Sequence, residues 1–183
     1  MGYVLAASQG LDVIALVVEE EIPPGIAAPL PDAGRASYPD WHAPLLRAGH
    51  AARRLLAGRA DDLHREFLLA SARPEGLDPA AVAVYLEAYS ADGQLDVDIG
   101  FYACQPTDLA TIERLRRRRL EVPVLTIGGA YAMGYAVSVA FRQLATTVDH
   151  VQSECSGHYP IEQDPEVTVG PAVDFLLAAG PAA

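Results

Sequence analysis

The sequence predicts an α/β fold built on a partial parallel sheet, and two observations carry that prediction. Three short apolar or β-branched runs, at residues 12–19, 122–127 and 146–151, have the length of strands. Each run is followed by a turn and a helical pattern, an alternation typical of parallel strands joined by helices. The first run contains six consecutive apolar residues at 13–18, as expected for a strand covered on both faces. We therefore expect about three parallel strands with flanking helices.

A long segment separates the first strand from the second. Residues 23–107 begin with several prolines, which predict an irregular start, and four helical patterns follow. Asp78 and Pro79 form a good helix start, with Asp as N-cap and Pro at the first position. The segment is far longer than a normal crossover, so it predicts an inserted all-helical unit. The core would then comprise residues 1–22 and 108–183. The four helices are expected at 51–57, 61–72, 79–89 and 94–104, and two core helices at 2–8 and 165–177.

The composition excludes several classes of function. The formal net charge of −11 argues against non-specific binding to nucleic acid or anionic membranes, which requires an excess of Lys and Arg. A basic run at 114–119 ends a predicted helix, where cations suit the negative end of the dipole. No apolar run reaches the ~20 residues that span a bilayer, and no basic stretch precedes an N-terminal apolar segment, so neither a membrane helix nor a signal peptide is expected.

The chain contains two cysteines, Cys104 and Cys155. Two cysteines in a chain of this length do not form a disulfide framework, so a reducing compartment and a cytoplasmic location are expected. The sequence leaves a single Cys104–Cys155 disulfide open. Metal binding by the cysteines is not expected, because neither has a close Cys or His partner.

His158 is the most informative residue. It lies on a loop, Ser-Gly-His-Tyr-Pro at 156–160, between the third strand and the last helix. A histidine after a strand on a glycine-bounded loop is placed to reach into a cleft, and the alternative is an ordinary surface histidine. Glu154, His158 and Glu162 are spaced by fours, but Gly157 and Pro160 interrupt any helix there, so no metal site is expected. His50, His64 and His150 are interpreted as surface residues.

Several short motifs follow one another in an order that resembles a known superfamily. They are Asp-Trp-His at 40–42, Leu-Leu-Ala-Gly-Arg at 55–59, Gly-Phe-Tyr at 100–102, Val-Pro-Val-Leu-Thr-Ile-Gly-Gly at 122–129 and Ser-Gly-His-Tyr-Pro-Ile-Glu at 156–162. Together with the order of the strands, they make the chain resemble the C-terminal half of an α/β-hydrolase. Within that superfamily it is most similar to the epoxide hydrolase and haloacetate dehalogenase group. The resemblance covers essentially all 183 residues and implies that residues 23–107 are a helical cap.

The resemblance implies a set of catalytic roles. His158 matches the general base, which activates water to hydrolyse a covalent ester intermediate. Glu20 matches the acid that orients this base, because the acid of the family lies four residues before a proline in a similar segment; Glu19 is the second choice. Tyr102 matches a cap tyrosine that donates a hydrogen bond to an epoxide oxygen or lines a halide pocket. The alternatives are a solvated acidic strand end and a tyrosine that packs between helices.

The resemblance also implies substrate-binding residues. Trp41 and His42 match a Trp-His pair at the entrance of the cap, and Tyr159 follows the base directly. Ala43 stands where the dehalogenases have a second tryptophan, which favours an epoxide or ester substrate over halide abstraction. The implied substrate is a small organic molecule, and no cofactor is implied.

The nucleophile of the family lies on a G-x-Nuc-x-G turn between a strand and a helix. Met1 and Gly2 are similar to the last two positions of that turn, which would put the nucleophile, an Asp or a Ser, one residue before Met1. We therefore expect a truncated chain without its nucleophile. The alternatives are a non-catalytic fragment or binding module that keeps the cap, and a C-terminal half that needs a complementing N-terminal half. The unpaired first strand would then drive self-association or pairing with that partner.

Overall fold

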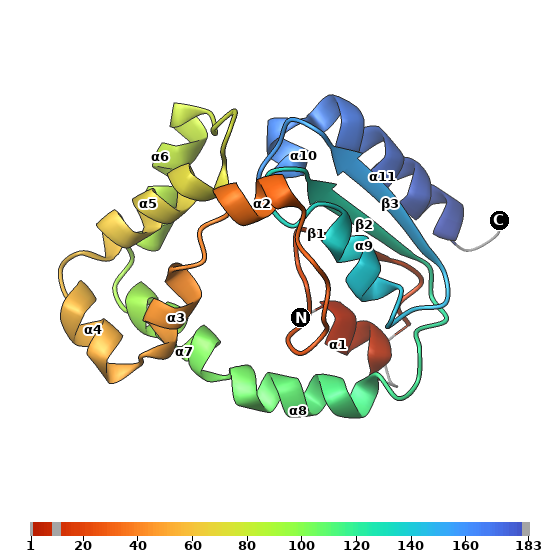
Figure 1. The fold of residues 1–183 in the computed structure, drawn as a ribbon, viewed down its shortest axis with the longest axis horizontal. Coiled ribbons are helices and arrows are strands. Elements are labelled where there is room, and N and C mark those ends of the chain that lie inside the picture. Colours follow the sequence, from red (N-terminus) through yellow and green to blue (C-terminus); the bar gives the residue numbers. More distant parts are fainter. Residues whose placement is uncertain (1, 9–11, 181–183) are drawn as a thin grey trace.

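Three parallel strands form the sheet of the computed structural model, which describes residues 2–8 and 12–180 (Figure 1). In spatial order they are β1 (Leu16–Glu19), β2 (Val124–Gly129) and β3 (Val148–Ser153), so β2 lies in the centre. The predicted α/β class, with about three parallel strands and flanking helices, is confirmed. Met1, which was compared with the nucleophile turn, lies outside the described residues.

The strands β2 and β3 begin and end two residues later than the sequence patterns predict. Gly128 and Gly129, expected to form a turn, complete β2 instead. A Cβ added to Gly128 would lie 2.3 Å from the carbonyl oxygen of Gly134, and one on Gly129 would lie 2.0 Å from the carbonyl oxygen of Gly157. The two glycines therefore allow other backbone segments to approach the end of the central strand.

Helices cover both faces of the central strand. All six residues of β2 are buried, and because successive side chains point to opposite faces, both faces must be covered. The helices α9 and α11 both pack on β2 and β3, and α1 packs on β1 and α8. The helices of the core are α1 (Gly2–Ala7), α9 (Tyr135–Phe141), α10 (Pro160–Gln163) and α11 (Pro165–Ala179).

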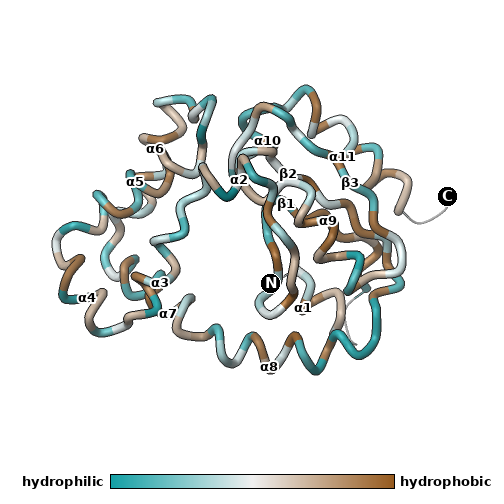
Figure 2. The backbone as a smooth tube through the Cα atoms, viewed as in Figure 1, coloured by the Kyte–Doolittle hydropathy of each residue, from teal (hydrophilic) through white to brown (hydrophobic). Residues whose placement is uncertain are grey.

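The largest hydrophobic core lies between the sheet, α9 and α1. Phe141 and Leu144 are almost completely buried there, and Tyr3 of α1 packs edge-on against Phe141. Figure 2 shows hydrophobic residues concentrated on the strands and on α9. Ile112 of α8 joins the same cluster, so the end of the long segment after β1 is fastened to the sheet.

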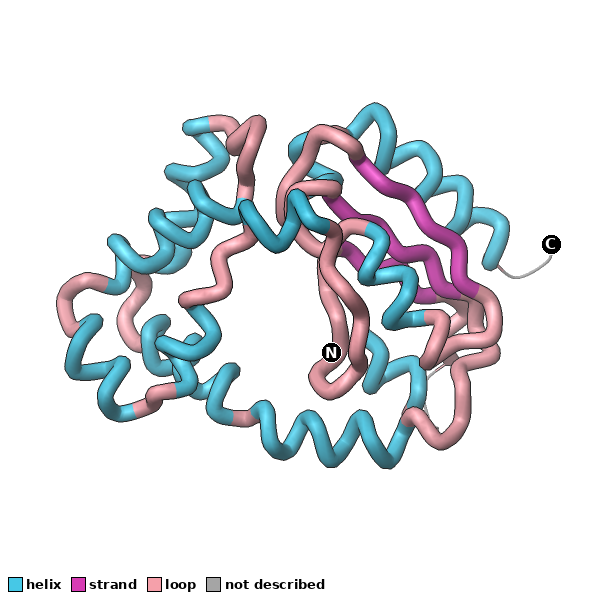
Figure 3. Tube along the Cα trace, viewed as in Figure 1, coloured by secondary structure: helices cyan, strands magenta, loops and turns pink. Residues whose placement is uncertain are grey.

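The segment between β1 and β2, called the helical insertion from here on, contains no strand among its residues (Figure 3). Two small hydrophobic clusters hold it together, one around Leu63 and Ile99 and the other around Leu68 and Leu86. Its helices are α2 (Asp32–Ser37), α3 (His42–Arg47), α4 (His50–Leu56), α5 (Ala60–Ser71), α6 (Pro79–Tyr89), α7 (Gln94–Ala103) and α8 (Gln105–Leu115).

The proline-rich start of the helical insertion is more ordered than the sequence predicts. Pro31 is the N-cap residue of α2, and Pro44 lies in the first turn of α3, where a missing backbone N–H costs nothing. The prolines therefore begin helices here instead of preventing them. The four predicted helices are present as α4 to α7. The expected domain boundary between residues 107 and 108 falls inside α8.

Within residues 2–8 and 12–180, no helix combines the length and the apolar character needed to cross a membrane. The same residues contain no cluster of three or more His, Cys, Asp or Glu side chains that could hold a metal ion. Cys104 and Cys155 are both exposed and unpaired.

Candidate functional site

Glu20 directly follows β1 and is buried, with only 2 % of the residue exposed. Its carboxylate accepts three backbone hydrogen bonds from the end of β2 and the loop that follows: from Gly129 at 2.7 Å, from Met133 at 2.8 Å and from Gly134 at 3.0 Å. These donors stabilise a negative charge that burial alone would disfavour. The backbone of Glu20 has a φ of +47°, which costs a residue with a Cβ roughly 1–2 kcal/mol. The fold therefore holds this carboxylate at one fixed point.

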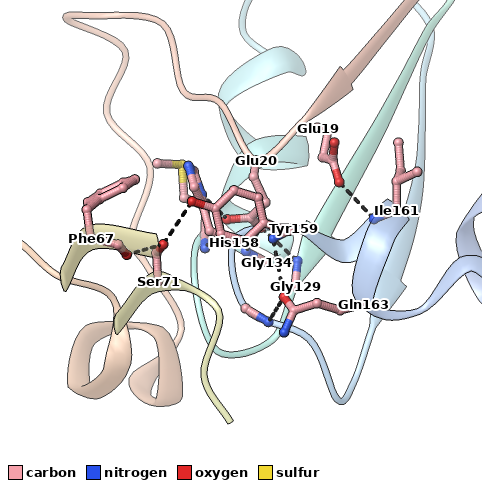
Figure 4. A network of polar contacts seen from close by, with 12 residues as sticks. Glu19, Glu20, Phe67, Ser71, Gly129, Gly134, His158, Tyr159, Ile161 and Gln163 are labelled. Atoms are coloured by element: carbon pink, nitrogen blue, oxygen red, sulfur yellow. Dashed lines mark hydrogen bonds and ion pairs between the residues drawn. The ribbon is translucent and has the colours of Figure 1, made fainter. Parts of the chain in front are cut away.

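His158 lies beside that carboxylate. Its Nδ1 atom is 3.2 Å from Oε2 of Glu20, 138 positions away along the chain (Figure 4). A carboxylate only accepts, so the proton of a neutral imidazole lies on Nδ1 and Nε2 carries a lone pair. Nε2 has no hydrogen bond to any residue in the described part of the chain. The side chain is 19 % exposed, so its free nitrogen is available to a bound molecule.

The His158 loop is fastened to the end of α5 in the helical insertion. The backbone N–H of His158 donates to the carbonyl oxygen of Ser71 at 2.8 Å. Gln163 of α10 accepts from the backbone of Gly157 and donates to the carbonyl oxygen of Ala72. A Cβ on Gly157 would lie 2.3 Å from the Ser71 carbonyl oxygen, so only glycine allows this approach. The helical insertion and the sheet thus meet at the histidine.

Glu19 has a different partner from Glu20. Its Oε1 atom accepts a hydrogen bond from the backbone of Ile161 at 2.8 Å, which ties β1 to the start of α10. Burial raises the pKa of this carboxyl above its ordinary value. The structure therefore brings Glu20, not Glu19, to His158.

The predicted catalytic tyrosine of the cap, Tyr102, and the three predicted substrate-binding residues divide into two groups. Tyr102 and His42 line a cavity of about 190 Å³ inside the helical insertion, with their rings 5.7 Å apart. Trp41 contacts His42 edge-on but is 38 % exposed and does not line this cavity. Tyr159 also lies outside the cavity lining: its hydroxyl accepts from Ser71 at 3.1 Å, and burial raises its pKa to about 12.

Two aromatic residues outside the predicted set contact the histidine. The ring of Tyr38 lies 4.9 Å from that of His158, and the ring of Phe67 lies 6.1 Å from it. Phe67 also contacts His42 at 4.4 Å and lines the cavity, so it links the cavity to the histidine. Burial raises the pKa of Tyr38 well above its ordinary value, which keeps its hydroxyl protonated.

The interpretation of His64 as a surface residue is wrong. Its side chain is 9 % exposed, and Nε2 lies 2.7 Å from Oδ2 of Asp98. It shares one face of α5 with Leu68 and Ser71, four and seven residues later, and all three are buried. That helical spacing is the signal in the sequence that indicates burial of His64.

The fold and this geometry define a class of protein. A strand that ends in a buried acid, a helical insertion, two further parallel strands and a histidine loop are the C-terminal part of the α/β-hydrolase fold. The resemblance drawn from the sequence is thus confirmed at the level of the fold.

Comparisons with solved structures identify particular proteins of that class. The epoxide hydrolase CorEH is 20% identical with a TM-score of 0.75, over 92% of this chain and 60% of that one. A candidate epoxide hydrolase from Pseudomonas aeruginosa is 19% identical with a TM-score of 0.77, over 97% of this chain and 61% of the other. A candidate acyltransferase from Salmonella enterica is 18% identical with a TM-score of 0.76, over 92% and 57%.

This chain therefore spans about three fifths of the length of these structural neighbours. At such identities the likeness establishes the fold, and the different descriptions of the neighbours agree with the rule that a fold does not fix a reaction. No protein-family model matches the sequence, and no curated protein does either.

Proposed function

We propose that this chain supplies the base and its orienting acid to a hydrolase active site of the epoxide hydrolase type. The substrate would be a small organic molecule, and the reaction would pass through a covalent ester intermediate. The contact between His158 Nδ1 and Glu20 Oε2 carries this proposal, because it leaves Nε2 free to take a proton from water.

In the proposed reaction His158 is the general base. Glu20 fixes the proton on Nδ1 and stabilises the imidazolium that forms when Nε2 accepts a proton from the attacking water. The three backbone donors keep the carboxylate from turning away. Tyr38 restricts the tilt of the imidazole ring by direct contact.

The helical insertion would be the cap that holds the substrate. Burial raises the pKa of Tyr102, so the phenol stays protonated and can donate a hydrogen bond to an oxygen that gains negative charge. We expect Trp41, which is partly exposed beside His42, to lie at the entrance of the substrate-binding site. We expect Tyr159, which is hydrogen-bonded to Ser71, to help hold the His158 loop.

The proposed reaction also needs a nucleophile. Among the described residues, none forms a hydrogen bond with Nε2 of His158. We propose that the nucleophile is an Asp or a Ser on polypeptide that continues the sheet beyond β1, since the structural neighbours are longer than this chain. The chain would then act only when that polypeptide is present.

The test is turnover of aryl epoxides, aryl esters and haloacetates. Turnover is measured for two proteins. One is the purified chain, and the other is the longer protein that results from extending the same reading frame upstream of Met1. We expect activity only in a protein with an upstream G-x-Asp or G-x-Ser turn. His158→Ala should then lower it by about 10²–10⁴-fold. His50→Ala changes an exposed histidine on α4 and is the matched control. Activity that survives His158→Ala would overturn the proposal.

A second candidate function is that of a non-catalytic module, or of a half that pairs with a partner. The observation that favours it is the outer edge of β1, which has no strand beside it among the described residues. Ile14, just before β1, is 54 % exposed, and an apolar unpaired edge favours association. Sedimentation would separate the cases, because pairing at this edge predicts a dimer or a stable complex with an added N-terminal half. A stable monomer without turnover would leave only the binding module.

A further inference from the structure

The cavity in the helical insertion contains a second histidine–carboxylate pair. The rings of His42, Phe67, Tyr89 and Tyr102 line the cavity together with His64 and Asp98. Neither His158 nor Glu20 is part of this lining. The reaction proposed above therefore leaves the His64–Asp98 pair without a role.

The hydrogen bonds of this pair orient Asp98 and leave its oxygens able to accept from a bound molecule. Nε2 of His64 donates to Oδ2 of Asp98 at 2.7 Å, and the side chain of Gln94 donates to Oδ1 at 3.0 Å. With its proton on Nε2, a neutral His64 has a lone pair on Nδ1, and that buried atom has no partner. Each oxygen of Asp98 keeps room for a further donor.

His42 adds another acceptor to the cavity. Its Nδ1 atom donates to the carbonyl oxygen of Pro39 at 2.9 Å, so Nε2 carries the lone pair. Burial lowers the pKa of His42, which keeps the ring neutral near pH 7. No Lys or Arg is among the residues that line the cavity. With His64 neutral, the charge within the lining is that of Asp98, and burial makes a carboxylate without a full counter-charge unfavourable.

Aromatic rings complete the environment. His64 stacks on Tyr89 at 4.4 Å, and Phe67 lies 4.4 Å from His42. Ring faces attract cations, and several rings around one carboxylate form a setting in which an organic ammonium ion is favoured over water. A cavity of about 190 Å³ has room for roughly six water-sized groups, so the ligand is small.

We propose that this cavity binds a small protonated amine on an apolar or aromatic body, with Asp98, held in place by His64 and Gln94, accepting hydrogen bonds from its N–H groups. Carboxylates such as haloacetates are disfavoured by the charge of Asp98. The idea that the amine is also the substrate rests on the proposed function. The binding of the amine does not depend on it.

The test uses three probes of one shape and different charge: benzylammonium, benzyl alcohol and benzoate. Titration calorimetry with the purified protein should give at least a tenfold higher affinity for benzylammonium than for benzyl alcohol, and no binding of benzoate. Equal affinities, or a preference for benzoate, would overturn the proposal without any mutation being needed.

Two matched variants locate the site. Asp98→Asn should remove the preference for benzylammonium and leave benzyl alcohol binding within about twofold. Asp96→Asn changes an exposed carboxylate on the same helix, paired with Arg53, and should alter nothing. An unchanged preference in Asp98→Asn would refute the assignment to this cavity. His158→Ala must keep the affinity for benzylammonium, so loss of turnover and loss of amine binding remain distinguishable.

Discussion

Replacing Glu20 with Gln removes the charge of the buried carboxylate while keeping its size. Oε1 of Glu20 accepts from Gly129 and Gly134, and Oε2 accepts from Met133 and His158. An amide has one oxygen, so its NH₂ group must face two of these donors. If the NH₂ group faces Gly129 and Gly134, two hydrogen bonds are lost. If it faces Met133 and His158, only the bond from Met133 is lost, because the imidazole can carry its proton on Nε2 and accept from the amide at Nδ1.

The size of the effect follows from the less costly arrangement, which loses the bond from Met133. A hydrogen bond to a charged group contributes about 1.5–3 kcal/mol, so Glu20→Gln should lower the free energy of unfolding by at least about 1.5–3 kcal/mol. That is a substantial part of the roughly 5–15 kcal/mol typical of a folded domain. Urea denaturation followed by circular dichroism measures the change as a fall in the midpoint.

Glu19→Gln is the matched control. Glu19 accepts one hydrogen bond, from Ile161, and the oxygen of a glutamine can keep it. The expected loss is below about 1 kcal/mol. A soluble Glu20→Gln protein with the same urea midpoint as Glu19→Gln would refute the reasoning, because it would mean that the four contacts of Glu20 do not stabilise the fold.

Three further outcomes follow from the structure. Gly157→Ala should lower the urea midpoint by an amount equivalent to about 1–3 kcal/mol, because its Cβ would lie 2.3 Å from the Ser71 carbonyl oxygen. Gly170→Ala is the control: its added Cβ would meet nothing within 4 Å, so it should not lower the urea midpoint. Equal urea midpoints for the two variants would contradict this explanation. Burial lowers the pKa of His42 and His150, so below about pH 6.5 the unfolded chain binds protons that the folded chain does not. The free energy of unfolding should therefore fall as the pH drops from neutral, and fall less in His42→Gln; an equally steep fall in that variant would count against burial as the cause. Burial raises the pKa of Tyr159 to about 12, so its contribution to stability is complete below about pH 10 and is lost as the pH rises through 12. Ultraviolet absorbance of tyrosinate should show its ionisation delayed in the folded protein, and a titration unchanged by Tyr159→Phe would argue against this.

The sequence predicts the strands and the larger helices because apolar runs and helical spacing are local. The exact strand ends are not local: Gly128 and Gly129 belong to β2 because they pair with Gln152 and Ser153 of β3. In the same way, Ile14 looks like part of the first strand, but β1 begins at Leu16, where pairing with Val124 starts.

The candidate site was predictable where the spacing of a known motif could be followed. A spacing of four residues to a proline narrows the three consecutive glutamates to Glu20 and Glu19, and the structure places Glu20 beside His158. Ser71, Gln163 and Tyr38 were not predictable, because their contacts join segments that lie far apart in the chain. No local pattern records such contacts.

The attachment of the His158 loop to the end of α5 also bears on how such proteins can be recombined. The histidine receives part of its position from the carbonyl oxygen of Ser71, and Gln163 holds the carbonyl oxygens of Ala72 and Gly76. A graft that exchanged residues 23–107 for the insertion of a relative would therefore also replace part of the support of the base. Chimaeras should keep the geometry of the histidine site only if the turn after α5 and the His158 loop both come from the same parent protein.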